Sequence, residues 1–262
     1  MSYEHVIYEK KGHVAYVTLN RPERMNALDE HSHRELIEIF DEFEADANAW
    51  LAIVTGAGDR AFCAGNDLHA TAEASANGHE RIDTRSRFAA ITRGYKCPKP
   101  LIAAVNGVAA GGGFEIALAC DLVIATDTAR FGLPEPRVGL IAGAGGIHRL
   151  SRQIPLKHAM GMLLTGRFVS AQEAHRLGFV NEVVPAAELM AAAERWATQI
   201  LECSPLLVSL TKESAQAGFG LPIDEAIDGD WQERIPRMLA SQDYIEGPKA
   251  FSEKRKPVWS GR

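Results

Sequence analysis

The sequence predicts an α/β fold, and the middle of the chain carries most of the evidence. There, a short apolar segment leads into a glycine turn and then into a helical pattern, and this order occurs three times. The three apolar segments are residues 51–55, 100–105 and 121–126. Repeated strand–helix units are typical of α/β architecture. The pattern by itself fits either a repeat fold or a doubly wound sheet.

The first elements of the chain are predicted to be a hairpin and a helix. Residues 5–19 alternate apolar and polar positions on either side of Lys11-Gly12, which indicates a β-hairpin. After Asp29 the apolar positions recur with helical spacing, and Asp29 itself is a suitable N-cap. The apolar face of this predicted helix consists of Leu36, Ile37, Phe40 and Phe43.

The last third of the chain is predicted to be mainly helical. After about Ile154 only residues 179–184 still resemble a strand, and the helical stretches are interrupted by prolines at 185, 205, 222 and 248. We therefore expect a core over residues 1–195 and a helical region over residues 196–262. Residues 70–84 are small and polar without a pattern, which predicts a mobile surface loop or a weak helix near the site.

Composition limits the class of protein. A chain of 262 residues with 46% hydrophobic residues can form one large domain or a domain with a small appendage. The net charge of −6 gives no basic field, so we expect no nucleic-acid or membrane partner. The four cysteines lie far apart, and no signal peptide or membrane span is apparent. We expect a cytoplasmic protein, although an organellar protein without its targeting segment would look the same.

The strongest local signal is a run of three glycines, Gly111 to Gly113, at the start of a predicted helix. Such a turn lets the backbone approach a ligand closely and leaves helical N–H groups available to an oxyanion or a phosphate. Glu115 follows in the first turn of this helix, which is otherwise apolar nearly all round. A carboxylate buried in that setting needs a partner or a task.

Two further segments have the character of a site. Glu135 lies between Pro134 and Pro136, which restrict the backbone around its carboxylate. Residues 56–61 formally match a dinucleotide-binding turn, but residues 62–65 break the chain again and no helix of the required length follows. We reject that interpretation and keep residues 62–67 as a place where backbone N–H groups can meet a polar atom. The histidines show no spacing typical of a metal site.

Four segments together carry a resemblance to a known family. They read AFCAGNDL (61–68), AAVNGVAAGGGFEIALACD (103–121), FGLPEPRVGLIAGAGG (131–146) and IEGPKAFSEKRKPVW (245–259). In this order, and over essentially the whole chain, the sequence resembles the enoyl-CoA hydratase/isomerase (crotonase) family. The resemblance implies a spiral of strand–strand–helix turns, with a helical C-terminal region that builds homotrimers, often paired into hexamers.

The resemblance also implies the roles of individual residues. The thioester oxygen of an acyl-CoA would be held by the backbone N–H groups of Ala64 and Gly112. Glu115 would activate a water molecule and Glu135 would handle the C2 proton, and two such carboxyl groups should influence each other's protonation. No metal and no cofactor are implied beyond the coenzyme A of the substrate. The residues implied in binding that substrate are Arg24, Ala64, Gly65, Asn66, Asp67, Leu68, Gly111, Gly143 and Lys254.

Three functions are compatible with these residues. The first is hydration of a trans-2-enoyl-CoA, or the reverse dehydration of a 3-hydroxyacyl-CoA. The second is another reaction of the family, such as enoyl-CoA isomerisation or the dehydration of carnitinyl-CoA, which the C-terminal segment favours. The third is acyl-CoA binding without catalysis. Ala142, Pro136 and Asn66 depart from the common family pattern around the acyl pocket and leave the acyl group open.

Overall fold

The computed structural model describes residues 3–68 and 88–262, which form two compact units. The first unit comprises Met1–Lys96 and Leu101–Glu194, and the second comprises Cys97–Pro100 and Arg195–Arg262. The loop predicted over residues 70–84 lies outside the described residues.

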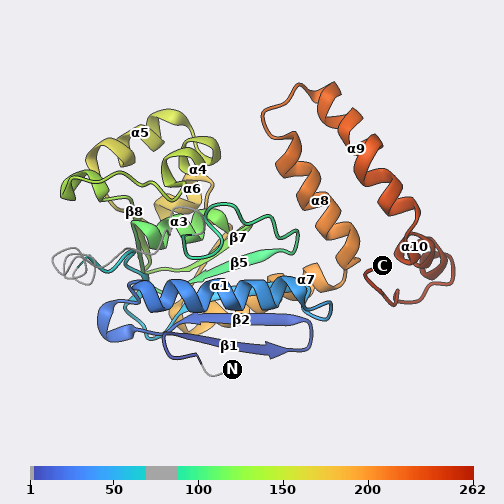
Figure 1. Ribbon diagram of the computed structural model, residues 1–262, viewed down its shortest axis with the longest axis horizontal. Coiled ribbons are helices and arrows are strands. Elements are labelled where there is room, and N and C mark those ends of the chain that lie inside the picture. Colours follow the sequence, from blue (N-terminus) through green and yellow to red (C-terminus); the bar gives the residue numbers. More distant parts are fainter. Residues whose placement is uncertain (1–2, 69–87) are drawn as a thin grey trace. The chain divides into compact units, whose positions relative to one another are not determined.

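A six-stranded sheet forms the centre of the first unit (Figure 1). Its strands, in spatial order, are β1 (Val6–Lys11), β2 (Val14–Leu19), β3 (Leu51–Gly56), β5 (Leu101–Val105), β7 (Leu122–Thr126) and β10 (Glu182–Val184). β1 pairs with β2 antiparallel, and all other neighbours are parallel. The predicted hairpin and the three predicted central strands are confirmed, as is the α/β fold class.

A second, four-stranded sheet distinguishes this fold from a plain doubly wound sheet. It contains β4 (Ala61–Cys63), β6 (Val108–Ala110), β8 (Arg130–Gly132) and β9 (Val169–Ser170). β4, β6 and β8 each follow directly on β3, β5 and β7 of the larger sheet, so every turn of the chain supplies one strand to each sheet. This is the strand–strand–helix spiral that the family resemblance implied. Strands of two or three residues beside glycines are too short to show a period in the sequence.

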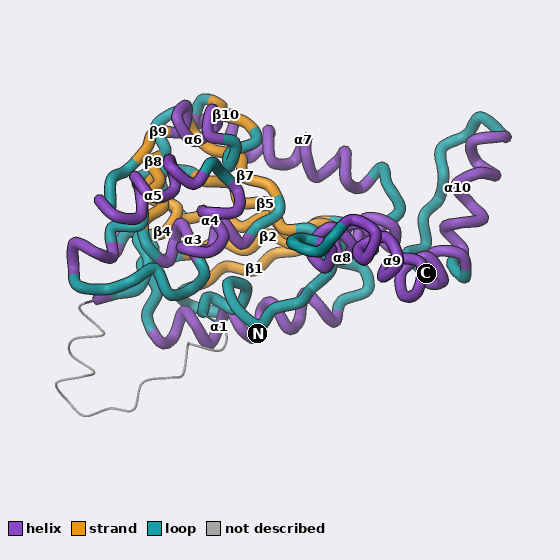
Figure 2. Tube along the Cα trace, turned by 90° about the horizontal axis from the view of Figure 1, so that it is seen from above, coloured by secondary structure: helices purple, strands orange, loops and turns teal. Residues whose placement is uncertain are grey.

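Helices cover both sheets of the first unit. α1 (Glu30–Ala45) begins at Asp29, whose side chain accepts a hydrogen bond from the Ser32 N–H at 2.8 Å, as the sequence predicted. Among the described residues of this unit, further helices are α3 (Gly112–Ala119), α4 (Gly146–Gln153), α5 (Leu156–Thr165) and α6 (Ala171–Leu177). In Figure 2, α1 lies along one side of the strands.

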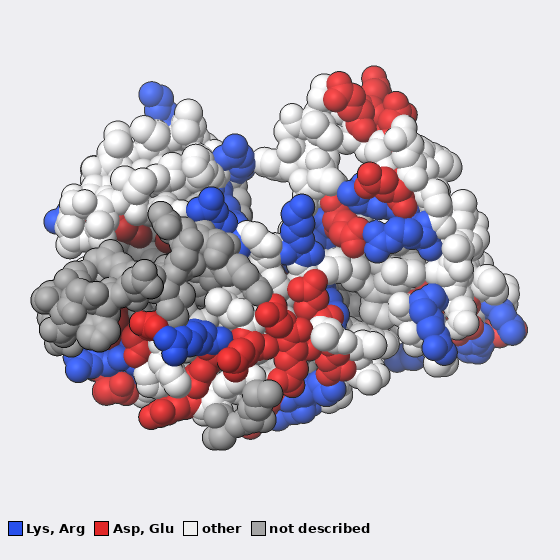
Figure 3. Space-filling model, in the orientation of Figure 1, with Lys and Arg blue, Asp and Glu red and all other residues white. Residues whose placement is uncertain are grey.

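The outer face of α1 carries a dense group of acidic side chains (Figure 3). Its exposed residues include Glu38, Asp41, Glu42 and Glu44. The buried side of the same helix presents apolar residues such as Phe40 and Phe43 to the core. An anionic ligand is therefore repelled from this face and has to be bound elsewhere on the unit.

The second unit is helical. Apart from the end of α7 (Leu189–Leu201) it contains α8 (Pro205–Gly218), α9 (Ile223–Leu239) and α10 (Gln242–Ser252). α8 and α9 form an antiparallel pair (Figure 1). No helix among the described residues is long and apolar enough to cross a membrane.

One expectation about this region is wrong: Pro248 does not separate two helices but lies inside α10. A proline within a helix removes one hydrogen bond and strains the preceding turn. The first turn of α10 is held independently, because the Asp243 carboxylate accepts hydrogen bonds from Ser204 Oγ (2.6 Å) and from the backbone N–H groups of Ser260 (2.8 Å) and Gly261 (3.1 Å). These tertiary bonds let the helix continue through the proline.

Gly113 brings the helix α3 into close backbone contact with the strand β4. A Cβ atom built on this residue would lie 2.0 Å from the carbonyl oxygen of Cys63 in β4, so no side chain fits at this position. The next residue, Phe114, is fully buried and packs its ring against Phe131 and Phe179 at centroid distances of 5.4 and 5.2 Å. The glycine therefore sets how closely α3 approaches β4.

Gly113→Ala is expected to lower the free energy of unfolding by about 2 kcal/mol or more, because a buried backbone carbonyl has to move to admit the methyl group. Gly161→Ala is the matched control, since a Cβ atom at this helical glycine of α5 meets no atom within 4 Å. The control is expected to gain about 0.5–1 kcal/mol. Urea unfolding of both variants measures the difference, and equal stability of the two would contradict the packing role of Gly113.

Candidate active site

A cavity of about 470 Å³ in the first unit contains both predicted glutamates. It lies where the turns after β4, β6 and β8 come together, close to the start of α4. Its described lining consists of Ala64, Gly65, Asn66, Leu68, Phe88, Arg93, Gly111, Gly112, Glu115, Pro134, Glu135, Val138, Leu140, Ile141, Gly143 and Ala144. Carboxylates in a mainly apolar cavity are the arrangement from which an enzyme obtains shifted pKa values.

The glycine turn lets the two carboxylates share this cavity. Gly111 has φ +53°, and its N–H donates to the Gly132 carbonyl at 2.9 Å, which ties the turn to β8. A Cβ atom on Gly111 would lie 3.1 Å from Glu135 Oε1. Glycine is therefore required here both for the backbone conformation and for the approach of the Glu135 carboxylate.

Glu115 is only 3% exposed, on the first turn of α3. Its Oε1 accepts a hydrogen bond from the Gly146 N–H, at the start of α4, at 2.8 Å. Burial is the main cause that brings the pKa of Glu115 up to about 7, and the charge of Glu135 acts in the same direction. The N–H groups of Gly146 and Ala144 and the Arg149 guanidinium oppose this rise in the pKa. Of the expected mutual influence, the effect of the Glu135 charge on Glu115 is present.

Glu135 begins the short 3-10 helix η2 (Glu135–Val138). Its Oε2 is one of two buried side-chain polar atoms that have no hydrogen-bond partner among the described residues. Burial also raises the pKa of this carboxyl group. An unpartnered buried carboxylate oxygen is costly in a folded protein, so its persistence beside a cavity indicates a task there.

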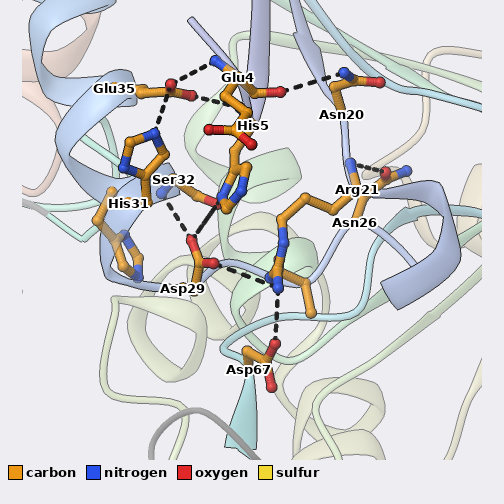
Figure 4. A network of polar contacts seen from close by, with 12 residues as sticks. Glu4, His5, Asn20, Arg21, Asn26, Asp29, His31, Ser32, Glu35 and Asp67 are labelled. Atoms are coloured by element: carbon orange, nitrogen blue, oxygen red, sulfur yellow. Dashed lines mark hydrogen bonds and ion pairs between the residues drawn. The ribbon is translucent and has the colours of Figure 1, made fainter. Parts of the chain in front are cut away.

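The turn after β4 is fixed from behind by an ionic network (Figure 4). Arg21 Nη2 lies 3.2 Å from the Asp67 carboxylate and 3.3 Å from that of Asp29, while its Nη1 donates to the Ala27 carbonyl at 2.6 Å. Burial alone would raise the pKa of Asp29, but hydrogen bonds from Ser32 and His5 and the charge of Arg21 outweigh it and hold the pKa at about 2. The network is therefore charged at neutral pH.

Two predictions for this turn need correction. Asp67 is not among the described lining residues of the cavity, and its carboxylate binds Arg21 instead of a ligand. The N–H of Ala64, expected to hold the thioester oxygen, donates to the Met25 carbonyl at 3.0 Å. Sequence spacing could not show this bond, because Met25 reaches Ala64 only through the fold. Ala64 still lines the cavity, together with Gly65, Asn66 and Leu68.

His33 fixes the orientation of the Asn66 side chain. Its Nδ1 accepts a hydrogen bond from the Ala89 N–H at 3.2 Å, so the proton of the neutral ring is on Nε2, which lies 3.2 Å from Asn66 Oδ1. Burial lowers the pKa of His33 and keeps the ring neutral. The His33 ring also packs edge-on against Phe88, another lining residue. His33 lies on the buried side of α1, and the sequence pattern did not indicate this role.

Arg149 and Arg93 were also missed. Arg149, on α4, donates from Nη2 to the Thr92 carbonyl (2.7 Å) and from Nη1 to the Ala144 carbonyl (3.2 Å), and so braces the turn whose amides face Glu115. Arg93 lines the cavity itself. Neither arginine belongs to a sequence motif that would have indicated its role.

Two predicted coenzyme ligands lie outside this cavity. Arg24, the last residue of the 3-10 helix η1 (Pro22–Arg24), is exposed and is not among the described lining residues. Lys254 belongs to the second unit, just beyond α10. The contribution of both residues to coenzyme binding stays a prediction.

Comparison with known proteins agrees with this geometry. The family described as enoyl-CoA hydratase/isomerase matches residues 9–262. The chain belongs to this family. A carnitinyl-CoA dehydratase from Proteus mirabilis is 44% identical over 96% of this chain and 97% of its own length, and one from Escherichia coli K12 is 42% identical over 97% of both.

Solved structures of the enoyl-CoA hydratase/isomerase family have the same fold. An enoyl-CoA hydratase from Mycobacterium tuberculosis superposes with a TM-score of 0.91 at 37% identity, covering 98% of this chain and 99% of its own. One from Mycobacterium marinum gives a TM-score of 0.90 at 38% identity, covering 98% and 99%. This chain is thus an enzyme of the enoyl-CoA hydratase/isomerase family, and the cavity described above is its candidate active site.

The raised pKa of Glu115 predicts a pH-dependent stability. The folded protein holds this proton between pH 4.5 and about 7, whereas the unfolded chain releases it near pH 4.5. Glu115 therefore stabilises the protein at low pH, and this contribution is lost as the pH rises through 7. Between pH 5 and pH 8, the wild type is expected to lose about 2–3 kcal/mol of unfolding free energy relative to Glu115→Gln.

Urea unfolding at a fixed protein concentration over this pH range tests the difference. Glu188→Gln, which removes an exposed carboxylate from the same unit, is the matched control and should follow the wild-type profile. Parallel profiles for the wild type and Glu115→Gln would show that the Glu115 carboxyl group is not perturbed by burial.

Proposed function

We propose that the protein is an enoyl-CoA hydratase, which adds water across the 2,3 double bond of a trans-2-enoyl-CoA and catalyses the reverse dehydration. The observation that carries this proposal is the pair of carboxyl groups, Glu115 and Glu135, in one cavity beside the glycine turn. Both have raised pKa values, which suits groups that exchange a proton with substrate near neutral pH.

In the proposed reaction the two carboxyl groups act on opposite ends of the same double bond. One glutamate, Glu115, orients a water molecule and accepts its proton as the oxygen bonds to C3. The π electrons of the double bond move toward the thioester, giving it enolate character. Glu135, protonated at the start, then donates its proton to C2, consistent with its unpartnered buried oxygen. The proton taken up by Glu115 returns to Glu135 through water, which restores both carboxyl groups. Proton transfer between carboxyl groups, water and substrate balances without any bound cofactor.

Developing charge on the thioester oxygen requires backbone donors. Gly112 begins α3, where helical N–H groups point out of the helix and the dipole favours negative charge. Since the Ala64 N–H is used by Met25, we propose the backbone N–H of Asn66 as the second donor. Asn66 lines the cavity, and the preceding Cα of Gly65 lies 3.4 Å from the position of a Cβ on Gly112. Two preorganised donors at this place stabilise the enolate by a few kcal/mol.

The second candidate is the dehydration of carnitinyl-CoA, favoured by the names of the two dehydratases that are 42–44% identical. It uses the same carboxyl pair and the same oxyanion donors in the direction of water loss. The two candidates therefore differ in the acyl group and not in the chemistry of the cavity.

We further propose that the protein is a homotrimer, or a dimer of trimers, assembled through the second unit in the cytoplasm. In support, α9 exposes Ile223 (70%), Ile227 (47%) and Trp231 (64%) at successive turns of one helical face. An apolar stripe of this kind on a short helical unit is typical of an assembly surface. Arg24 and Lys254 remain our candidates for the coenzyme phosphates.

Glu115→Gln and Glu135→Gln are each expected to lower kcat for crotonyl-CoA hydration by about 100-fold or more, because each removes a group that transfers a proton. The loss of the conjugated-thioester absorbance measures the rate. Binding of unreactive butyryl-CoA should be retained, and Glu188→Gln should have wild-type activity. Unimpaired hydration by the double glutamine variant, or tight acyl-CoA binding without any turnover by the wild type, would overturn the proposed function.

Charged substitutions in the apolar stripe of α9 are expected to dissociate the assembly. We expect the wild type to have three or six times the mass of one chain by sedimentation equilibrium, and Ile227→Glu/Trp231→Glu to have the mass of one chain. Glu225→Gln, an exposed residue of the same helix, should leave the mass unchanged. A wild-type protein with the mass of one chain would contradict the trimer.

A further inference from the structure

A second cavity, of about 590 Å³, adjoins the candidate active site. The two cavities share three lining residues, Arg93, Gly143 and Ala144. Beyond these, the described lining of the second cavity includes Arg149, Arg152 and His148 and contains no carboxylate. A concave site with three guanidinium groups has the donors and the charge to bind an anion.

The positive charge of this cavity is only partly compensated. Arg149 is held in the wall by the Thr92 and Ala144 carbonyls, and Arg152 Nη1 donates to the His148 carbonyl at 3.0 Å. Carbonyl groups satisfy hydrogen bonds but do not neutralise charge. Arg93 is exposed and forms no ion pair with any described carboxylate.

Among the described carboxyl groups, Glu115 is the one whose charge acts on Arg149. Because burial raises the pKa of Glu115 to about 7, this carboxyl group is substantially protonated near neutral pH. It therefore offsets at most a part of the charge of the three arginines. The second cavity keeps a positive potential that a ligand of opposite sign can use.

If a thioester binds as the proposed function requires, its acyl chain would extend from the two glutamates toward this second cavity, because the two cavities share Arg93, Gly143 and Ala144. Its oxygen faces Gly112 and Asn66, neither of which lines the second cavity, and its C2 and C3 atoms lie beside the two glutamates. Carbons beyond C3 continue past Glu115, and the wall on that side is formed by Gly143 and Ala144, with Arg93 at the junction.

We propose that Arg93 and Arg152 form a subsite for an anionic group at the far end of the acyl chain, so that the preferred substrates are enoyl-CoA thioesters whose acyl group ends in a carboxylate. This proposal rests on the proposed function and names its substrate class. The same potential disfavours a quaternary ammonium group at that end, which opposes the second candidate reaction.

The test measures dissociation constants of saturated thioesters that cannot react, by isothermal titration calorimetry on the full chain. Glutaryl-CoA is paired with valeryl-CoA, and adipyl-CoA with hexanoyl-CoA, so that each pair differs only in a terminal carboxylate in place of a methyl group. At least one acid is expected to bind about tenfold tighter than its neutral partner, as a charge-assisted contact to arginine implies. The cationic 4-(trimethylammonio)butyryl-CoA is expected to bind more weakly than valeryl-CoA.

Variants identify the groups responsible. Arg93→Gln/Arg152→Gln is expected to bring the affinities of the acid and its neutral partner to within about twofold of each other, and Arg93→Lys to retain part of the preference. Arg176→Gln removes an equal charge from an exposed site on α6 and should keep the full preference. If Arg93→Gln weakens both members of a pair equally, the arginine serves the coenzyme phosphates and the proposal is wrong.

The remaining outcomes separate this proposal from the proposed function. Equal affinity within both pairs, or tighter binding of the cation, overturns the anionic subsite even if crotonyl-CoA is hydrated. A preference for the acids that depends on the arginines supports the subsite even if crotonyl-CoA is not hydrated, and the hydratase proposal then fails by itself. Absence of binding by every thioester overturns both.

Discussion

A carboxylate buried in an apolar helix is expensive, and the arrangement around Glu115 follows from that cost. The helix α3 places it among Phe114, Ile116 and other buried side chains, where a charge is only poorly solvated. The Gly146 N–H at 2.8 Å reduces the cost, and protonation removes much of the rest, since the pKa is about 7. The burial of Glu115 lowers the stability of the folded protein at neutral pH. The same burial brings the pKa of Glu115 near 7, where the group can both accept and donate a proton.

Close backbone approach brings this group to the cavity. Each turn of the spiral adds a strand to the large sheet and a short strand to the small one, and the turns after the short strands meet on one side. Gly113 allows α3 to touch β4, and Gly111 allows Glu135 to approach from the turn after β8. Larger residues at either position would separate segments that have to converge. The glycines therefore contribute geometry to the site and no functional group.

Side chains behind the cavity wall hold the lining residues in position. Arg21 and Asp67 hold the turn after β4, and neutral His33 orients the Asn66 amide. Arg149 braces the turn that donates to Glu115. These contacts fix the wall around the carboxyl pair, whereas the proposed anionic subsite lies in the adjoining cavity lined by Arg93 and Arg152.

The sequence by itself determined the fold class, the hairpin, the central strands and the N-cap of α1, because each depends on local periodicity or on one side chain near its own backbone. It also indicated both glutamates: Glu115 from an apolar helix behind three glycines, and Glu135 from flanking prolines and the family motif. It could not show that the Ala64 N–H is used by Met25, that Asp67 binds Arg21, or that α10 continues through Pro248. Nor did it indicate Arg93, Arg149 or His33. Only the tertiary structure decided these points, because each depends on a contact between segments distant in sequence, and local patterns contain no information about which distant partner a polar group meets.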